Sequence, residues 1–178
     1  ETSDSLSVPT LAVPASVELS AQGSVALDAF GVLIAKGSFK LELGTVKESA
    51  APAKTYQAMV LTLGSTAFDG ASPVEVFVGV GGALVDTNGD DNSPGGTFSD
   101  NVVNTDAGMG FYASLETLTL VTLKDDNGTA TVKTDDVSYM GLELNGLTAK
   151  LVGIEGFKFG VYSGAVKVTC TPSAWGVK

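Results

Sequence analysis

The sequence predicts an all-β fold, and three observations carry that prediction. Every odd position from 17 to 43 is apolar or Gly, while most even positions are polar, an alternation typical of strands with one buried face. Glycine accounts for 22 of the 178 residues, well above the usual ~7%, and suits tight corners between strands. No window of helical length shows an apolar stripe with the helical period.

The alternation between positions 17 and 43 passes through three glycines without changing phase. These are Gly23, Gly31 and Gly37. Corners that keep the same side chains inward suit strands that bend around a core. We therefore expect an elongated β-solenoid-like stack, with a β-sandwich or jelly roll as the alternative. The side chains expected in its core are those at odd positions, among them Leu19, Leu27, Leu33 and Leu41.

The rest of the chain divides by composition. Residues 1–15 are rich in Ser, Thr and Pro without any period, so we expect an extended N-terminal arm or linker. Residues 16–170 are expected to form a single all-β domain with an acidic loop at 84–108, followed by a C-terminal tail at 171–178. Further strands are predicted at Tyr56–Leu63, Val74–Val80, Met109–Leu123, Ala130–Val132, Val137–Leu144 and within 147–170.

Charge and residue usage exclude several classes of function. The chain has 10 basic residues, all Lys, against 20 acidic ones, a net charge of −10, and no His. Without His, an imidazole general base, a Ser–His couple and an ordinary zinc site are excluded. The negative charge would repel nucleic acid and anionic membranes. No run of ~18 apolar residues offers a membrane-spanning helix, so membrane insertion is not expected.

The acidic residues gather in the middle of the chain. Between positions 55 and 123 there are acids and no basic residue, and five of the acids lie between Asp86 and Asp106. Asp86, Asn88 and Asp90 match the opening of a calcium loop, because short oxygen ligands at alternate positions can converge on one hard cation. An EF-hand is excluded, since Asp91 stands where that loop needs Gly and no helices flank it. The candidate calcium ligands are Asp86, Asn88, Asp90, Asp91, Asp100 and Asp106. The alternative is a solvated acidic loop without an ion.

Other residues that could carry chemistry point to structure instead. No pair of carboxylates is singled out as a glycosidase site. Cys170 follows Val166 and Val168 at even spacing and is expected to be a buried small hydrophobe. The run from Asp125 to Gly128 contains Asn-Gly, which predicts a hairpin turn. A sugar-stacking platform would need aromatic residues that are scattered along the chain: Tyr56, Tyr112, Tyr139, Tyr162 and Trp175. We therefore expect no enzymatic activity.

Three segments, in the same order, resemble the repeat unit of very large bacterial extracellular or surface proteins, which are repetitive and adhesin-like. They are Ser24–Leu43 (SVALDAFGVLIAKGSFKLEL), Val74–Asp86 (VEVFVGVGGALVD) and Val137–Thr169. The resemblance implies a secreted structural or adhesive module, located outside the cell or on its surface, and no catalytic residue. The chain differs from that pattern in its longer insertion at 86–108.

Together these features predict a non-enzymatic extracellular structural or adhesive module stabilised by calcium, whose partners are neighbouring copies of the same module. Three alternatives stay open, the last of them a glycosidase or lyase, which would need a cleft holding two facing carboxylates. The arm at 1–15 could add a strand to another copy, which would make the chain a filament or surface-layer subunit. The chain could instead be a carbohydrate-binding module for surface glycans.

Overall fold

The computed structural model describes residues 17–48, 54–91, 96, 98–129, 131–132, 134–156 and 158–170, and the predicted arm and tail lie outside them. The described residues form an all-β structure, as predicted, and contain no helix long and apolar enough to cross a bilayer. The strands are β1 (Val17–Ala29), β2 (Leu33–Lys47), β3 (Thr55–Gly64), β4 (Val74–Val80), β5 (Ala83–Val85), β6 (Val102–Asn104), β7 (Met109–Leu115), β8 (Thr117–Asp125), β9 (Val137–Val152) and β10 (Gly160–Cys170).

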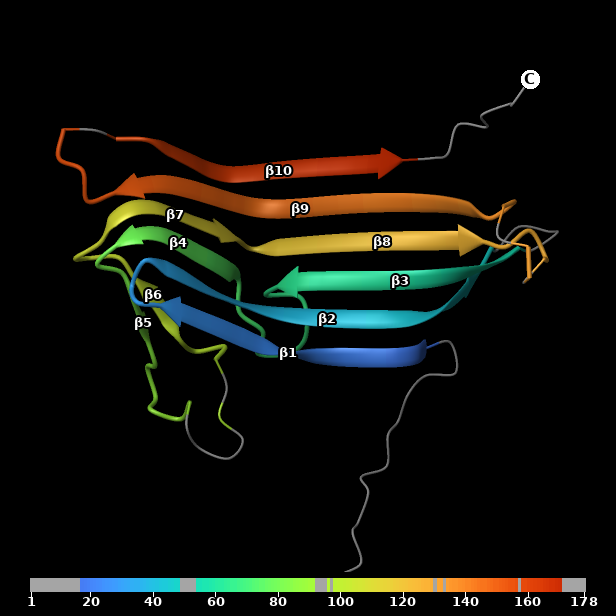
Figure 1. Ribbon diagram of the computed structural model, residues 1–178, viewed down its shortest axis with the longest axis horizontal. Coiled ribbons are helices and arrows are strands. Elements are labelled where there is room, and N and C mark those ends of the chain that lie inside the picture. The colour runs from blue at the N-terminus through green and yellow to red at the C-terminus, as the bar shows by residue number, and fades with distance from the viewer. Residues whose placement is uncertain are drawn as a thin grey trace, which may run out of the picture.

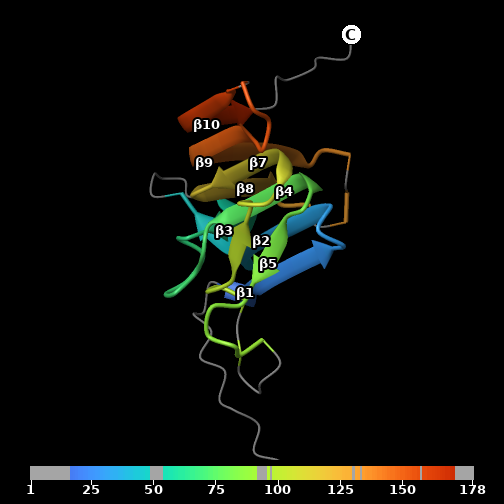
Figure 2. The ribbon, with the colours of Figure 1, turned by 90° about the vertical axis from the view of Figure 1, so that its left-hand side faces the viewer.

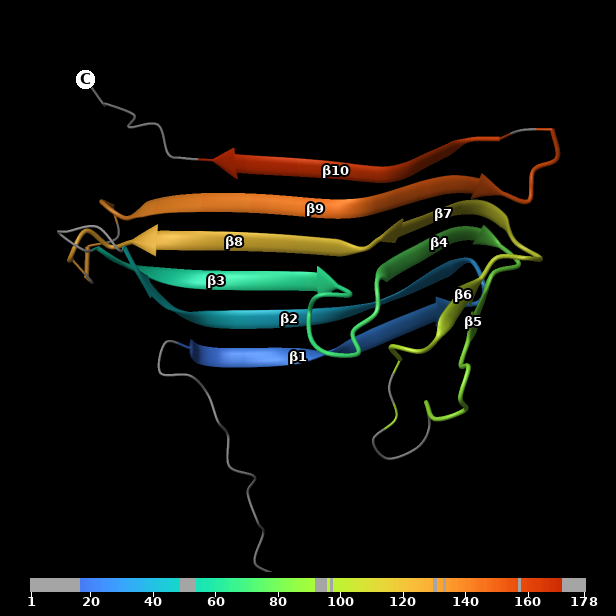
Figure 3. The ribbon, with the colours of Figure 1, turned by 180° about the vertical axis from the view of Figure 1, so that it is seen from behind.

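Eight of these strands form one large antiparallel sheet of six rows (Figures 1 and 3). β1, β2, β9 and β10 are long and each fills a row. β3 and β4 share the third row, because both pair with β2, and β7 and β8 share the fourth row, because both pair with β9. β5 and β6 pair only with each other and form a hairpin-like excursion between β4 and β7.

The first hairpin explains why the alternation continues through position 31. Ala29 pairs with Leu33, so the loop has three residues and leaves the odd positions of both strands on one face. Phe30 and Gly31 have positive φ angles of 56° and 65°. The Asp28 carboxylate accepts a hydrogen bond from the Gly31 amide at 2.8 Å. Of the three glycines expected at corners, this one alone lies in a turn, whereas Gly23 and Gly37 lie inside β1 and β2.

A line of irregularities crosses the sheet between its two halves. Residues 65–73 separate β3 from β4, and Glu116 separates β7 from β8. Opposite Glu116, Gly146 takes a φ of 69° inside β9, and β10 shifts register between Val161 and Val166. Each extra residue moves the alternation by one position, so that Leu115 and Leu118 lie on the same face of the sheet.

Most of the large apolar side chains of the main sheet therefore share one face, which we call the apolar face. In the register of the strands, its cross-strand rows include Leu19–Leu43–Met59, Ala21–Leu41–Leu61–Leu120–Leu142–Val168, Phe39–Leu63–Leu118–Leu144–Val166, and Leu33–Val78–Phe111–Leu151.

The apolar face is not covered by any described part of the chain. Leu19 is 48% exposed, Leu27 50% and Leu33 38%, and Leu41 is half-buried. The prediction that these odd positions share a face is confirmed, but the prediction that they are buried in a core of this chain is wrong. The alternation reports which side chains point the same way and carries no information on what lies against them.

The opposite face, which we call the polar face, carries the core that the described residues do form. The β5–β6 excursion lies over the end of the sheet where β2 meets β4 (Figure 2). Beneath it Ile34 and Phe77 are fully buried and contact Val103, with Tyr112 and Leu84 packed around them. In the middle of the polar face one cross-strand row is polar and consists of Lys40, Thr62, Thr119 and Glu143. Towards the opposite end this face carries a second group of apolar and aromatic side chains: Val46, Tyr56, Val60, Val121, Leu123 and Tyr139.

The finer prediction of a solenoid-like stack is not confirmed. Every strand pairing among the described residues is antiparallel, and the main sheet forms a single layer. A solenoid of parallel coils would bury its inward face within one chain, whereas this sheet leaves its apolar face open.

Candidate functional site

The acidic loop connects β5 to β6. Asp86 is the first residue after β5, and Asp100 lies two residues before β6. Asp106 follows β6. The β5–β6 ladder, in which Val85 pairs with Val102, brings the two ends of the loop together. Asp86 and Asp100 are therefore brought close together, at the end of the sheet that β5 and β6 occupy (Figure 1).

Three of the predicted ligands form one cluster. Asp86, Asp90 and Asp100 each offer a carboxylate oxygen, and these three oxygens lie within 4.8 Å of one another. The Asp86 side chain holds the start of the loop in a turn, because its Oδ1 accepts hydrogen bonds from the backbone amides of Asn88 and Gly89 at 3.0 and 2.6 Å. This is the turn chemistry for which Asp and Asn are favoured.

The Asp86 carboxylate is held in its charged form. Partial desolvation raises its pKa, but hydrogen bonds from the backbone amides of Asp91, Gly89, Asn88 and Asp90 outweigh that effect, so the pKa of Asp86 is lowered from its ordinary value. An ionised carboxylate beside two others is costly unless water, salt or a cation offsets the charge, and residues 55–123 themselves contain no Lys.

Buried acceptor oxygens lie next to this cluster. Asp91 Oδ1, Asp100 Oδ1 and Asn101 Oδ1 are buried without a hydrogen-bond donor. Asn101 is only 1% exposed, and its Nδ2 donates to Asp91 Oδ2 at 2.8 Å. Since a buried acceptor without a donor is costly, such atoms call for an explanation. Oxygens cannot satisfy one another, and a cation satisfies several at once.

The other predicted ligands have different roles in the structure. Asn88 closes the loop, because its Oδ1 accepts from the Asp90 amide and its Nδ2 donates to Asp90 Oδ2. Asp91 is tied to Asn101. Asp106 lies outside the cluster, and its amide donates to Asn104 Oδ1 at 2.8 Å. Asn101 was not predicted, because a polar residue ahead of a short strand gives no sign in the sequence that its side chain will be buried.

The base of the loop is fixed by a buried lysine. Lys36 of β2, 7% exposed, donates a hydrogen bond to the backbone carbonyl of Asn101 and forms an ion pair with Glu75 at 3.4 Å. Glu75 also accepts a hydrogen bond from the Tyr112 hydroxyl. Desolvation and this bond raise the pKa of Tyr112 to about 12. The acidic loop is thus anchored to the polar face of the sheet through one buried polar network.

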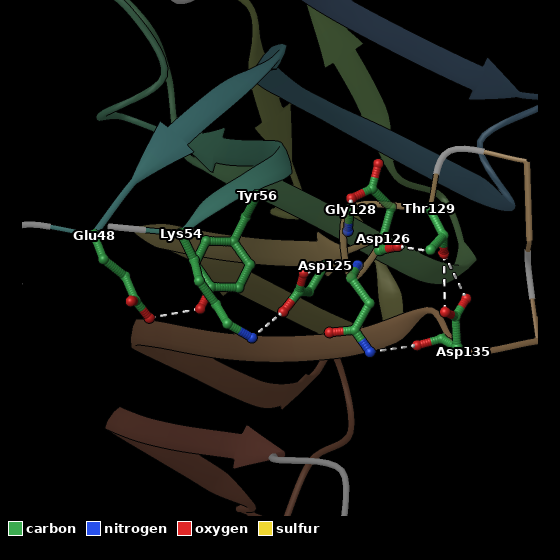
Figure 4. Close-up of polar contacts among 9 residues, drawn as sticks. Glu48, Lys54, Tyr56, Asp125, Asp126, Gly128, Thr129 and Asp135 are labelled. Atoms are coloured by element: carbon green, nitrogen blue, oxygen red, sulfur yellow. Dashed lines mark hydrogen bonds and ion pairs between the residues drawn. The ribbon is translucent and has the colours of Figure 1, made fainter. Parts of the chain in front are cut away.

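A second polar cluster occupies the opposite end of the sheet (Figure 4). Lys54 and Asp125 form an ion pair at 2.7 Å, and the Tyr56 hydroxyl donates to Glu48 at 2.5 Å. Asp125 also accepts from the Asn127 amide and begins the predicted turn. The bond to Lys54 lowers the pKa of Asp125, and the bond to Glu48 raises the pKa of Tyr56 to about 12.

The described tyrosines do not form an exposed platform. Tyr56 is 9% exposed and meets Tyr139 edge to face, with ring centroids 6.1 Å apart. Tyr112 is covered by Lys150, whose ammonium lies 4.9 Å from the ring centroid. Tyr162 is 69% exposed and stands apart on β10, while Trp175 lies outside the described residues. The side chain of Cys170 also lies outside what is described, although its backbone pairs with Met140.

Comparison with known proteins adds no homologue. No family model, curated protein or solved structure matches the chain. What the acidic loop and the sheet do must therefore be inferred from their own geometry and chemistry.

Proposed function

We propose that this chain is a non-enzymatic structural module of an extracellular or cell-surface assembly, and that its acidic loop holds a divalent cation, calcium. One observation carries the cation: the Asp86, Asp90 and Asp100 carboxylates lie within 4.8 Å of one another, beside buried acceptor oxygens that have no donor. The extracellular setting rests on the resemblance to surface-protein repeats.

The donor set favours calcium over other metals. All the available ligand atoms are oxygens of Asp and Asn, which suit hard cations, and the chain has no His for a softer metal. Calcium accepts six to eight oxygens in a flexible geometry, whereas magnesium demands a near-octahedral site and keeps several waters. A loop that offers carboxylates from both its ends fits the more tolerant ion.

A bound cation would stiffen the module. Asp86 and Asp90 follow β5 and Asp100 precedes β6, so an ion between them would link the two ends of the acidic loop, within the β5–β6 excursion that covers Phe77. Because such an ion binds the folded state, it would raise the free energy of unfolding with its concentration. Rigidity would then depend on calcium, as suits a protein that works outside the cell.

Calcium titration by calorimetry, with thermal unfolding followed in parallel, tests the proposal. The wild-type protein should bind calcium and gain thermal stability at millimolar concentration, and Asp86→Asn should lose most of both effects. Asp106→Asn is the matched control, since Asp106 lies in the same region outside the cluster, and it should behave as wild type. Absence of heat and of a thermal shift in the wild-type protein, or equal loss in both variants, would contradict the cation site.

A second candidate, a filament subunit that receives a strand from another copy, is favoured by the edges of the sheet. β1 and β10 each have a free outer edge among the described strands, and an open edge is a template for strand addition. Deleting residues 1–15 should abolish assembly if that segment is the donated strand, and unchanged assembly would exclude it.

A carbohydrate-binding role has less support, because the hydroxyls of Tyr56 and Tyr112 are engaged within the chain.

A further inference from the structure

The apolar face extends across all six rows of the sheet, and Thr122, between Met59 and Met140, is a polar residue within it. Where β3 and β8 form the middle rows, it presents mainly Leu, with Phe39, Met59 and Met140 beside them. Where β4 and β7 replace them, it presents Val, Ala, Phe, Leu and Met. Many of these side chains are substantially exposed: Leu19, Val25, Leu27, Leu33, Val78, Val80, Met109, Phe111, Met140, Val161, Val166 and Val168.

Charged side chains are few on this face. Among the charged residues of the main strands, Lys47 and Lys124 fall on the apolar side, at the end where β2 and β8 meet the loops. Glu18 lies at the register shift in β1, and Glu116 lies at the mid-sheet irregularity. The other charged residues of the paired strands, such as Lys40, Glu42 and Glu143, lie on the polar face.

The size of the face exceeds what a monomer normally exposes. Six rows spaced ~4.8 Å apart, apolar over about ten residues at ~3.3 Å each, cover roughly 900 Å². A soluble monomer rarely exposes an apolar patch of more than a few hundred Å².

We propose that the apolar face binds the apolar face of a second copy of this chain, so that two sheets form one sandwich. The area matches, because roughly 900 Å² per partner is close to the ~800 Å² that each side of a specific interface buries. The charge pattern is compatible with this contact, because the acidic loop lies on the opposite face, where the Phe98 amide donates to Ser24.

The shape of the face also suits a copy of itself. Two identical sheets have the same twist, so they pack in the aligned arrangement of sandwiches, ~10 Å apart. A hollow of about 260 Å³ lies between Val25, Phe39 and Val74, while Phe111, 60% exposed, protrudes. Hollows and protruding aromatic side chains are what an interdigitating interface requires. The sandwich that the sequence offers as an alternative fold would then form between two chains. This proposal does not depend on the cation site.

Sedimentation equilibrium of matched lysine variants tests the interface. The wild-type protein should have twice the 18.0 kDa chain mass, and Val78→Lys and Phe111→Lys on the apolar face should weaken association by about 100-fold or more. Val102→Lys is the control: Val102 is a β6 valine that is 46% exposed, close to the 51% of Val78, but off the apolar face. It should remain dimeric. Circular dichroism checks that each variant keeps its strands.

A measurement on the unmodified protein guards against variants that fail to fold. All three methionines, Met59, Met109 and Met140, lie on the apolar face. Their oxidation by peroxide should slow as the protein concentration rises through the dimer range. A wild-type monomer at high concentration, oxidation that is independent of concentration, or dimers unaffected by the lysines would overturn the proposal. So would polymers that persist in Val78→Lys, which would indicate edge pairing, or binding of the wild-type protein to neutral phospholipid vesicles in place of self-association.

Discussion

Lys36 is the residue on which the polar face depends most. It is a buried cation between two acceptors, the Glu75 carboxylate and the backbone carbonyl of Asn101. A buried ion pair contributes little net stability compared with apolar packing, but removing one partner leaves the other uncompensated. The sequence shows Lys36 at an even position, as for any solvated strand lysine. It gives no indication that the β5–β6 excursion will cover it.

Replacing this lysine should therefore destabilise the fold. Lys36→Met keeps most of the side-chain volume and leaves Glu75 without its cation, so the free energy of unfolding should fall by about 2–4 kcal/mol in urea titration. Lys40→Met, on the same strand and face but with a surface partner in Glu42, should change it by less than about 1 kcal/mol. Equal losses in the two variants would argue against the buried network.

The two engaged tyrosines predict a loss of stability in alkali. Tyr56 and Tyr112 both have pKa values raised to about 12 in the folded protein, against 10.0 for the free side chain. Each protonated hydroxyl donates to a Glu, so the contribution is fully present below pH 10 and is lost as the pH rises towards 12. Tyrosinate absorbance should show two tyrosines that ionise near pH 12. The urea concentration at the midpoint of unfolding should decrease as the pH rises from 10 to 12. Tyr56→Phe should remove one of the two groups that ionise near pH 12.

Strand irregularities connect the sequence to the sheet at the scale of the element. The apolar spacing changes from two to three between Leu115 and Leu118 and again between Leu144 and Leu147. Each change marks an extra residue, at Glu116 and near Gly146, and the two irregularities lie opposite each other. The sequence predicts these strands, but it predicts one continuous strand from Met109 to Leu123 where the structure has β7 and β8. The change of spacing is the information that would have separated them.

Gly146 is accordingly expected to resist substitution. Its φ is +69°, and a Cβ there would collide with the Glu116 side chain, so Gly146→Ala should cost about 1–3 kcal/mol of unfolding free energy. Gly141 provides the control within β9, since a Cβ at that position meets nothing within 4 Å. Gly141→Ala should be neutral or slightly stabilising. Chemical denaturation of both variants compares them, and a neutral Gly146→Ala would show that the irregularity is not required.

At the scale of the whole molecule, the sequence predicts the composition of each face but not its environment. A strand face buried by its own chain and one buried by a second chain show the same alternation of apolar and polar residues. The sequence therefore places Leu19 and Leu27 on one face, but it does not say whether this chain covers that face. The acidic loop shows the same limit of sequence-based prediction. The spacing of Asp86 and Asp90 indicates that their carboxylates can meet, whereas Asp100 is brought to them by the pairing of β5 with β6. Long-range pairing of this kind leaves no local pattern.

A dimeric assembly predicts that stability depends on protein concentration. If folded chains associate through the apolar face, the thermal midpoint of the wild-type protein should rise with concentration, because association stabilises the folded state by mass action. In Val78→Lys the midpoint should be lower and independent of concentration. Differential scanning calorimetry over a hundredfold range of concentration makes the comparison, and a constant wild-type midpoint would contradict association.

The number of rows in the sheet has a consequence for growth. Because the rows number six and alternate in direction, β1 and β10 run oppositely, and both Val17 and Cys170 lie at the same end of the sheet (Figure 1). A copy displaced sideways by about 29 Å, six strand spacings, would meet its neighbour with antiparallel edges and the same face upward. With an odd number of rows the two edge strands would run in the same direction, and the edges of neighbouring copies would meet as parallel strands. β10 is regular only from Val166 to Cys170, because its register with β9 shifts between Val161 and Val166. Edge-to-edge pairing between two copies through β10 would therefore be limited to that end of the strand.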